Sequence, residues 1–341
     1  MNVDTEVQDL RKAQLMSWLN NVVEDKSWQL EVASADASFR RYFRLIFKDK
    51  TLIAMDAPPD KEDIKPFIKV ASAFKSLGVN VPEIYAQDLN QGFMLLQDFG
   101  SVCFLDELAD DSADKLYQDA MQALQTLQSS EKPGDVKLPA YDAELLMREM
   151  ALFSDWFIEK HLSLSISDAE RETLNSSFEM LRDNALQQPQ VWVHRDYHSR
   201  NLMVYEADNP GIIDFQDAVH GAITYDLVSL LRDCYISWPD DKIYTWVASY
   251  LNGLKAKGIC AEVSNEDFIR WFDLMGAQRH LKAIGIFARL NHRDGKSGYL
   301  KDIPRTMSYV ETVCDKYPEL QSFSNLIENK VKPALMEAQT Q

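Results

Sequence analysis

The first hundred residues show two kinds of apolar spacing. Residues 4–23 place apolar side chains at helical intervals, and this pattern predicts an amphipathic helix. Several short runs rich in aromatic and β-branched residues follow, as is typical of strands. We expect strands at 28–33, 39–47, 51–55, 81–86 and 93–97, and a second helix at 61–77. This region therefore predicts a small antiparallel sheet with an internal helix.

Helical periodicity dominates the chain after Gly100. We expect helices at 105–127, 143–161, 167–187, 224–231, 243–253, 266–290 and 307–316. A strand-rich interval interrupts them, with short apolar runs at 191–193, 202–205 and 211–214. The predicted fold class is α+β, with a small β-rich N-lobe at 1–97 and a large, mainly helical C-lobe at 98–341.

Charge and composition exclude several kinds of partner. The 341 residues hold 36 Lys and Arg against 53 Asp and Glu, a formal net charge of −17. We expect no nucleic-acid partner, because such proteins need a basic footprint. No apolar run approaches the roughly 18 residues that span a bilayer, and residues 1–11 contain no apolar signal core. The four cysteines form no C-x-x-C pair, so we expect reduced thiols. Without a spanning run or a signal segment, we expect a cytoplasmic protein with no membrane partner. We also expect a monomer.

The segment 194–201 carries the strongest chemical signal. It reads His-Arg-Asp-Tyr-His-Ser-Arg-Asn and fits H-x-D-x-x-x-x-N, the catalytic-loop spacing of phosphoryl-transfer enzymes. In such a loop a carboxylate approaches the attacking hydroxyl, and an amide oxygen five residues later reaches a metal on the phosphates. Asp196 is therefore the candidate catalytic base, and Asn201 is a candidate metal ligand.

A second candidate metal ligand follows a short apolar strand. Asp214 ends the run Ile212-Ile213-Asp214, eighteen positions after Asp196. Mg²⁺ prefers one or two carboxylates together with substrate phosphates, and Asp214 with Asn201 meets that preference. The alternative is that these residues only form turns at strand ends.

These motifs resemble the aminoglycoside phosphotransferase and choline kinase branch of the protein-kinase-like superfamily. The Ile-Asp-Phe at 213–215 stands where protein kinases carry Asp-Phe-Gly. Segments 38–44 and 55–59 and the tract 278–305 are similar to the N-acetylmuramate/N-acetylglucosamine anomeric kinases of bacterial cell-wall recycling. The resemblance implies a protein-kinase-like two-lobed fold, ATP and Mg²⁺ as cofactors, and a small-molecule sugar substrate that becomes a sugar 1-phosphate.

The resemblance also implies where the nucleotide binds. A phosphate-covering loop is expected between the first two strands, over Ser34, Ala35, Asp36, Ala37 and Ser38. It contains no glycine, but small side chains let backbone N–H groups approach phosphates. The adenine ring is expected beside Leu96, Gln97 and Asp98, where an extended strand joins the lobes.

A lysine usual in this superfamily is missing from the third strand, where Met55 stands near its expected place. A kinase needs this cation on its phosphates. We expect an arginine of the second strand to replace it, Arg41 first, with Arg40, Arg44, Lys65 and Lys69 as the other candidates. The alternative is that these arginines form a solvated strand face.

Acceptor contacts are harder to assign. The candidates are Asp217, Arg232, Asp233 and Arg293, which follow the metal segment or lie in the tract 278–305. The alternative for each is a structural ion network. Asp226 is expected to hold the catalytic loop, through Arg195, rather than to touch substrate.

Two other functions compete with the sugar kinase. One is a kinase of the same fold that acts on an aminoglycoside, choline or homoserine. The other is a nucleotide-binding pseudokinase, which the missing lysine favours and the complete set of Asp196, Asn201 and Asp214 opposes.

Overall fold

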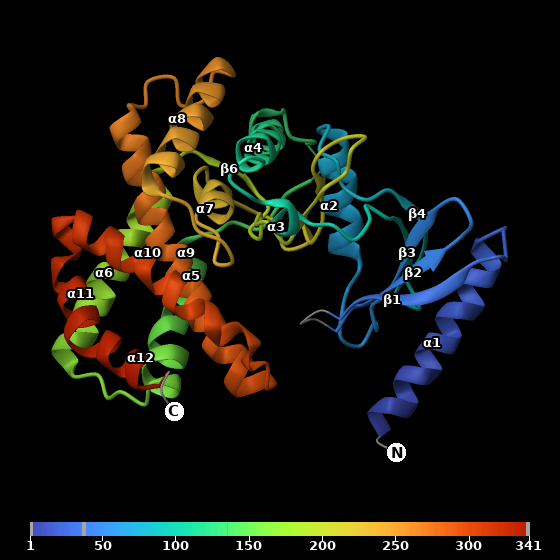
Figure 1. Ribbon diagram of the computed structural model, residues 1–341, viewed down its shortest axis with the longest axis horizontal. Helices are drawn as coiled ribbons and strands as arrows, with labels where there is room; N and C mark the ends of the chain where they lie inside the picture. Colours follow the sequence, from blue (N-terminus) through green and yellow to red (C-terminus); the bar gives the residue numbers. More distant parts are fainter. Residues whose placement is uncertain (1–2, 36–38, 135, 339–341) are drawn as a thin grey trace. The chain divides into compact units, whose positions relative to one another are not determined.

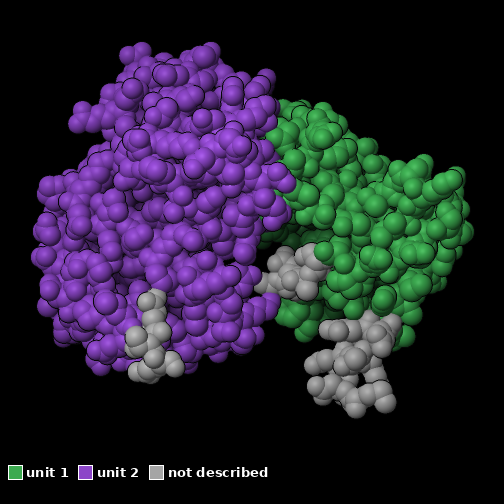
Figure 2. Space-filling model, viewed as in Figure 1, with its two compact units in different colours: residues 1–103, 202–217 green, residues 104–201, 218–341 purple. Residues whose placement is uncertain are grey.

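The computed structural model describes residues 3–35, 39–134 and 136–338. They form two compact units, one of residues 1–103 and 202–217 and one of residues 104–201 and 218–341 (Figure 2). The sequence pattern puts a single boundary at residue 97. The segment 202–217 belongs to the first unit because Val204 donates to the carbonyl of Val102 (2.9 Å) and Phe215 packs on Phe67 (ring centroids 4.7 Å apart). Contacts between such distant positions leave no local sequence pattern.

The first unit is built on a five-stranded antiparallel sheet in the order β1-β2-β3-β5-β4. Its strands are β1 (Gln29–Ala35), β2 (Arg41–Ile46), β3 (Thr51–Asp56), β4 (Ile84–Asp88) and β5 (Phe93–Gln97). The predicted strands are confirmed to within a few residues. β5 lies between β3 and β4 and is buried along most of its length, so the sheet positions the residues that follow Gln97.

Two helices of the first unit pack apolar side chains against its other elements. α1 (Val3–Val22) contributes Leu15 and Leu19 to a core that includes Phe43 and Leu45 of β2. Each large side chain buried in this way stabilises the unit by about 1.5–3 kcal/mol. α2 (Lys65–Ser76) buries one apolar face, and Phe74 packs on the ring of Phe215 (centroids 6.0 Å apart). α1 precedes the sheet in sequence and α2 connects β3 to β4, and Figure 1 shows both helices beside the sheet.

A short hairpin completes the first unit. β7 (Leu202–Met203) pairs with β8 (Gly211–Ile212). The backbone N–H of Ile212 donates to the carbonyl of Asn80 (2.8 Å). This bond fixes the segment that ends in Asp214 to the loop before β4.

The second unit is mainly helical. Its elements are α3 (Phe104–Glu107), α4 (Ala113–Ser129), α5 (Ala143–Leu152), η1 (Phe153–His161), α6 (Asp168–Gln187), β6 (Gln190–Val193), β9 (Val219–Ala222), α7 (Tyr225–Leu231), α8 (Asp240–Ala256), α9 (Asn265–Asp294), η2 (Ser297–Asp302), α10 (Ile303–Lys316), η3 (Pro318–Leu320), α11 (Gln321–Leu326), η4 (Ile327–Val331) and α12 (Lys332–Ala338). The predicted β-rich and helical parts are therefore confirmed. None of the helices among the described residues is long and apolar enough to cross a membrane.

Three details of the second unit differ from the prediction. The expected helix at 105–127 is interrupted because the Ser112 hydroxyl accepts from the N–H of Ala109 (2.9 Å) and donates to the carbonyl of Glu107 (2.6 Å), which replaces helical bonds there. The expected helix at 143–161 continues from α5 into the π-helix η1. β9 pairs antiparallel with β6, a long-range pairing without a local signal.

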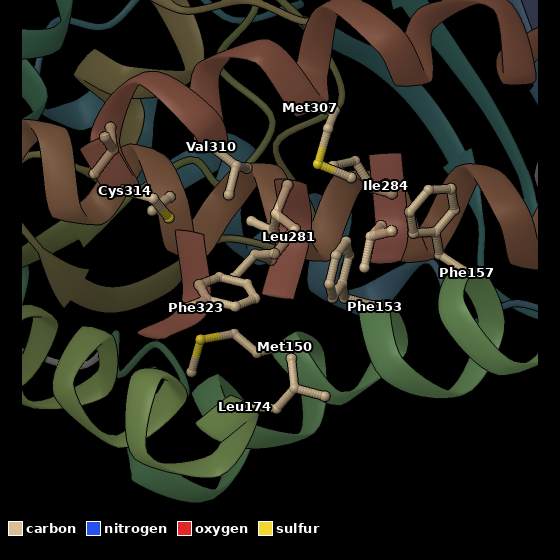
Figure 3. Close-up of a cluster of buried hydrophobic side chains, with 14 of the residues drawn as sticks. Met150, Phe153, Phe157, Leu174, Leu281, Ile284, Met307, Val310, Cys314 and Phe323 are labelled. Carbon is tan, nitrogen blue, oxygen red and sulfur yellow. The ribbon is translucent and has the colours of Figure 1, made fainter. Parts of the chain in front are cut away.

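The long helix α9 runs through the core of the second unit, in contact with α5, α6, α7, α10 and η1. Figure 3 shows Leu281 and Ile284 of α9 against Phe153 and Met307. At Gly285 the helix approaches another backbone. A β-carbon there would lie 2.3 Å from the carbonyl carbon of Leu152. Glycine is therefore required for α9 to pack closely on the end of α5.

This close approach predicts that Gly285→Ala destabilises the protein. The added methyl would meet backbone, which cannot move aside as a side chain can, so we expect the free energy of unfolding to fall by about 1–3 kcal/mol. Chemical denaturation followed by circular dichroism measures this change.

Gly276→Ala on the same helix is the matched control. A β-carbon there lies 3.8 Å from its nearest neighbours, an ordinary contact, and alanine favours the helix by about 1 kcal/mol. We expect this variant to be as stable as the native chain or more so. Equal stability of the two variants would contradict the packing described.

Candidate active site

A buried carboxylate holds the start of the catalytic loop. The loop 194–201 leaves β6, and Asp226 at the start of α7 accepts the backbone N–H groups of His194 (2.6 Å) and Arg195 (2.9 Å). Asp226 has no exposed surface. Burial raises the pKa of Asp226 to about 7, although both N–H donors favour its charged form. The prediction that Asp226 holds the loop is supported, but the contact is to the Arg195 backbone and not to its side chain.

A second carboxylate holds the middle of the loop. Asp233 accepts the backbone N–H of Ser199 (2.9 Å) and the Ser199 hydroxyl. Its other oxygen accepts the N–H of Tyr235 (3.0 Å). Because aspartate oxygens are strong acceptors for N–H groups, Asp226 and Asp233 together fix the loop at both sides of Asp196.

An ion network involving Glu149 supports the loop. The Arg195 backbone has a φ of +84°, an uncommon conformation for a residue with a side chain, and its guanidinium pairs with Glu149. Lys282 of α9 also pairs with Glu149 (3.3 Å) and donates to the Tyr225 hydroxyl (3.0 Å). Burial alone would raise the pKa of Glu149, but Lys282 and Arg195 lower it.

Asp196 is half-buried and ionised. Burial would raise the pKa of Asp196, but the nearby cations, Lys282 above all, lower it below its usual value. The Asn201 amide nitrogen donates to the backbone carbonyl of Asp196 (3.0 Å). The predicted base and the predicted metal ligand are thus tied together within one loop.

The carboxylate of Asp196 lines a cavity of about 150 Å³ within the second unit. A single water needs roughly 10–15 Å³ by this measure of volume, so the cavity has room for a small molecule. The other lining residues are His198, Tyr225, Asp233, Cys234, Tyr235, Arg279, Lys282, Ala283, Ile286, Phe287, Leu290 and Tyr299. Charged groups lie beside Asp196, and aromatic and aliphatic side chains line the rest, as is typical of a small-molecule site.

The four predicted acceptor residues lie in different places. Asp233 lines the cavity. Arg232 is buried and pairs with Asp240 (3.2 Å) and Asp273 (3.6 Å), so it belongs to a structural network. Arg293 is exposed and pairs with its neighbour Asp294 (2.8 Å), and Asp217 is exposed in the first unit. Neither Arg232, Arg293 nor Asp217 lines this cavity.

The predicted phosphate cation Arg41 has a strong internal partner. Its Nε donates to Asp56 (3.0 Å), a fully buried carboxylate that also accepts Arg11 (3.1 Å). Arg40 is placed differently. It pairs with Glu62 (3.1 Å). Burial lowers the pKa of Arg40, but nearby groups that include Glu62, Asp214 and Asp217 raise it overall.

The segments predicted to hold the adenine ring and to cover the phosphates are partly described. Ser34 and Ala35 end β1, and Asp36, Ala37 and Ser38 lie outside the described residues. Leu96 is in the central strand β5 with neighbours on both sides, so its backbone is used within the sheet. Gln97 donates its N–H to Glu83 (2.8 Å), and Asp98 accepts Arg44 (2.6 Å). The adenine position expected at Leu96, Gln97 and Asp98 stays a prediction.

The oxygen ligands predicted for a metal fit a hard cation. Asp214 has a φ of +64° and accepts the side-chain amide of Gln216 (2.7 Å), so its carboxylate is oriented by its own segment. No group of three or more His, Cys, Asp or Glu side chains among the described residues forms a metal cage. Mg²⁺ does not need such a cage when phosphates supply its other ligands.

The residues that the sequence prediction missed come mostly from α9. Arg279, Lys282, Phe287 and Leu290 line the cavity at intervals of three to five positions, close to the spacing of one helical face. That periodicity is visible in the sequence, but a buried core face has the same period. Only the position of the catalytic loop in space distinguishes the two.

Comparison with known proteins agrees with this geometry. The model of the phosphotransferase enzyme family matches residues 29–260. The chain is 45% identical to the N-acetylmuramate/N-acetylglucosamine kinase of Pseudomonas putida, over 94% of this chain and 96% of that one. It is 40% identical to the enzyme of the same name from Neisseria meningitidis, over 91% and 93%.

Solved structures of low sequence identity share the fold. The ethanolamine kinase of Plasmodium vivax matches with a TM-score of 0.64 and 14% identity, over 94% of this chain and 90% of that one. The choline kinase LicA of Streptococcus pneumoniae matches with a TM-score of 0.58 and 14% identity, over 88% and 99%. The predicted kinase-like fold is thereby confirmed. The family model covers most of the chain, and the relatives match it nearly end to end. The chain therefore belongs to the phosphotransferase enzyme family.

Proposed function

We propose that this chain transfers the γ-phosphoryl group of ATP to the anomeric hydroxyl of N-acetylmuramate or N-acetylglucosamine, which gives a sugar 1-phosphate. The observation that carries the proposal is the ionised Asp196 on the wall of a small-molecule cavity. The names of the relatives, at 40–45% identity, support the choice of sugar. The four cysteines form no disulfide among the described residues, which supports the cytoplasm, where thiols stay reduced and ATP is available, as the proposed location.

The reaction needs a base and fixed geometry. Asp196 accepts the proton of the anomeric hydroxyl as its oxygen forms a bond to the γ-phosphorus, and the bond from that phosphorus to the bridging oxygen of ADP breaks. Asp226 and Asp233 hold the loop so that the carboxylate meets the hydroxyl without reorganisation. Mg²⁺, held by Asn201 and Asp214, would neutralise charge on the phosphates. The side chains of the cavity orient the sugar.

Arg40 is proposed as the replacement for the missing lysine. It pairs with Glu62, which precedes α2, and the charge of Asp214 acts on it. This arrangement is the counterpart of the lysine and helix glutamate of other kinases. Arg41, proposed first from the sequence, is already bound by Asp56.

The acceptor is tested by ³¹P NMR with ATP and a panel of N-acetylmuramate, N-acetylglucosamine, glucose, kanamycin, choline and homoserine. We expect an anomeric phosphate signal from the first two alone. Phosphorylation of another acceptor would overturn the sugar assignment but retain the kinase. Nucleotide binding without transfer to any acceptor would favour the pseudokinase.

Asp196→Asn tests the catalytic base. The amide cannot accept the proton, so we expect turnover to fall by about 10²- to 10⁴-fold, with the affinity for ATP unchanged in a calorimetric titration. Asp60→Asn removes an exposed carboxylate (73% exposed) and should leave turnover unchanged. Near-normal turnover of Asp196→Asn would exclude this role.

Arg40→Gln tests the phosphate cation. Loss of a charged hydrogen bond of about 1.5–3 kcal/mol should reduce kcat/KM for ATP by roughly 10- to 100-fold. Arg40→Lys retains the charge and should recover most of this loss. A variant that keeps native kcat/KM for ATP would return the assignment to Arg41 or another cation.

A further inference from the structure

Arg279 differs from the other buried cations of the second unit. Among the described residues of this unit, three lysine and arginine side chains are buried, Arg232 (1% exposed), Arg279 (6%) and Lys282 (7%). Arg232 pairs with Asp273, and Lys282 pairs with Glu149. Among the described residues no carboxylate forms an ion pair with Arg279. Its Nε has no hydrogen-bond partner, and its Nη1 reaches only the sulfur of Cys234 (3.9 Å).

An unpaired buried guanidinium is costly. Arginine is almost never buried without a partner, and removing a charge from water costs several kcal/mol unless another group compensates it. Cys234 does not compensate it as an anion, because burial raises the pKa of its thiol. Burial lowers the pKa of Arg279, but nearby groups that include Asp196 and Asp233 raise it overall. The two carboxylates therefore act on Arg279 through space, without forming an ion pair with it among the described residues.

Arg279 lies on the wall of the cavity that holds the candidate base. Arg279 lines the same cavity as Asp196, one turn of α9 before Lys282. Farther along α9, Phe287 stacks on Tyr299 (ring centroids 5.7 Å apart) and both line the cavity. The cavity therefore offers a base, a cation and an aromatic wall, which suits a sugar that carries an anionic substituent.

We propose that Arg279 binds the carboxylate of an anionic sugar acceptor and thereby sets the preference between the two proposed sugars. N-acetylmuramate is N-acetylglucosamine with an added lactyl ether that ends in a carboxylate. The planar guanidinium matches a carboxylate in a bidentate pair. The inference rests on the proposed function, because it concerns the acceptor site of that reaction.

Another role for Arg279 predicts a different result. If its charge only balances the carboxylates of Asp196 and Asp233, it serves every acceptor equally. If it binds the lactyl carboxylate, it serves N-acetylmuramate alone. The ratio of kcat/KM between the two sugars separates these roles, because any effect on Asp196 or on the fold cancels in the ratio.

The test measures kcat/KM for both sugars with the native enzyme, Arg279→Met and Arg279→Lys. Loss of one partner of a buried charge pair weakens binding strongly, so we expect the ratio of kcat/KM for N-acetylmuramate to kcat/KM for N-acetylglucosamine to fall by on the order of 100-fold in Arg279→Met. Arg279→Lys should recover part of this loss. Lys282→Met is the matched control, because its cation is already paired, and it should lower both activities while leaving the ratio unchanged.

A modified sugar provides a second test, part of which uses the native enzyme alone. The carboxamide of N-acetylmuramate keeps the shape of the lactyl group and removes its charge. On the carboxamide, we expect the native enzyme to lose as much activity as Arg279→Met loses on N-acetylmuramate. We expect Arg279→Met to have equal activity on N-acetylmuramate and on its carboxamide.

Two results would overturn the inference while leaving the proposed function intact. They are an unchanged ratio in Arg279→Met, and equal activity of the native enzyme on N-acetylmuramate and its carboxamide. Failure of the native enzyme to phosphorylate either sugar would instead overturn the proposed function, and the inference with it.

Discussion

The active site depends on the two hydrogen bonds by which Asp226 holds the backbone of His194 and Arg195. The Asp226 carboxylate and the His194 N–H are fully buried, and the Arg195 N–H is partly buried. Loss of the carboxylate would leave these N–H groups unsatisfied, at a cost to folding stability of about 1–3 kcal/mol each. The two hydrogen bonds support the left-handed backbone of Arg195, which in turn directs its side chain to Glu149. The position of Asp196, the next residue, follows from this anchor.

Carboxylates and cations alternate in the contacts around the catalytic loop. Glu149 lies beneath it and neutralises Arg195 and Lys282, so that these cations are fixed before a substrate arrives. Lys282 in turn is the main cation that keeps Asp196 ionised. Such preorganised charges contribute to catalysis because they need no rearrangement during the reaction. Arg279 lies in the field of Asp196 and Asp233 but forms no ion pair with a carboxylate in the described chain, and its guanidinium is the group proposed to bind the acceptor.

Much of the fold follows from local sequence, and part of the site does not. Strand and helix periodicity located the sheet and most helices, and fixed spacing within one loop identified Asp196 and Asn201. Which carboxylate pairs with which arginine depends on the folded structure. Asp56 binds the side chain of Arg41, and Asp273 binds Arg232, from positions that the sequence does not bring together. The cavity face of α9 has the period of an ordinary core helix, so Arg279 could not be distinguished before the structure placed it beside Asp196.

The most direct test of the central claim is a crystal structure of Asp196→Asn with N-acetylmuramate bound. We expect the anomeric hydroxyl within hydrogen-bond distance of the side chain at position 196, roughly 2.6–3.2 Å, and the lactyl carboxylate against the guanidinium of Arg279. A sugar bound with its anomeric carbon directed away from position 196, or bound outside this cavity, would contradict the account.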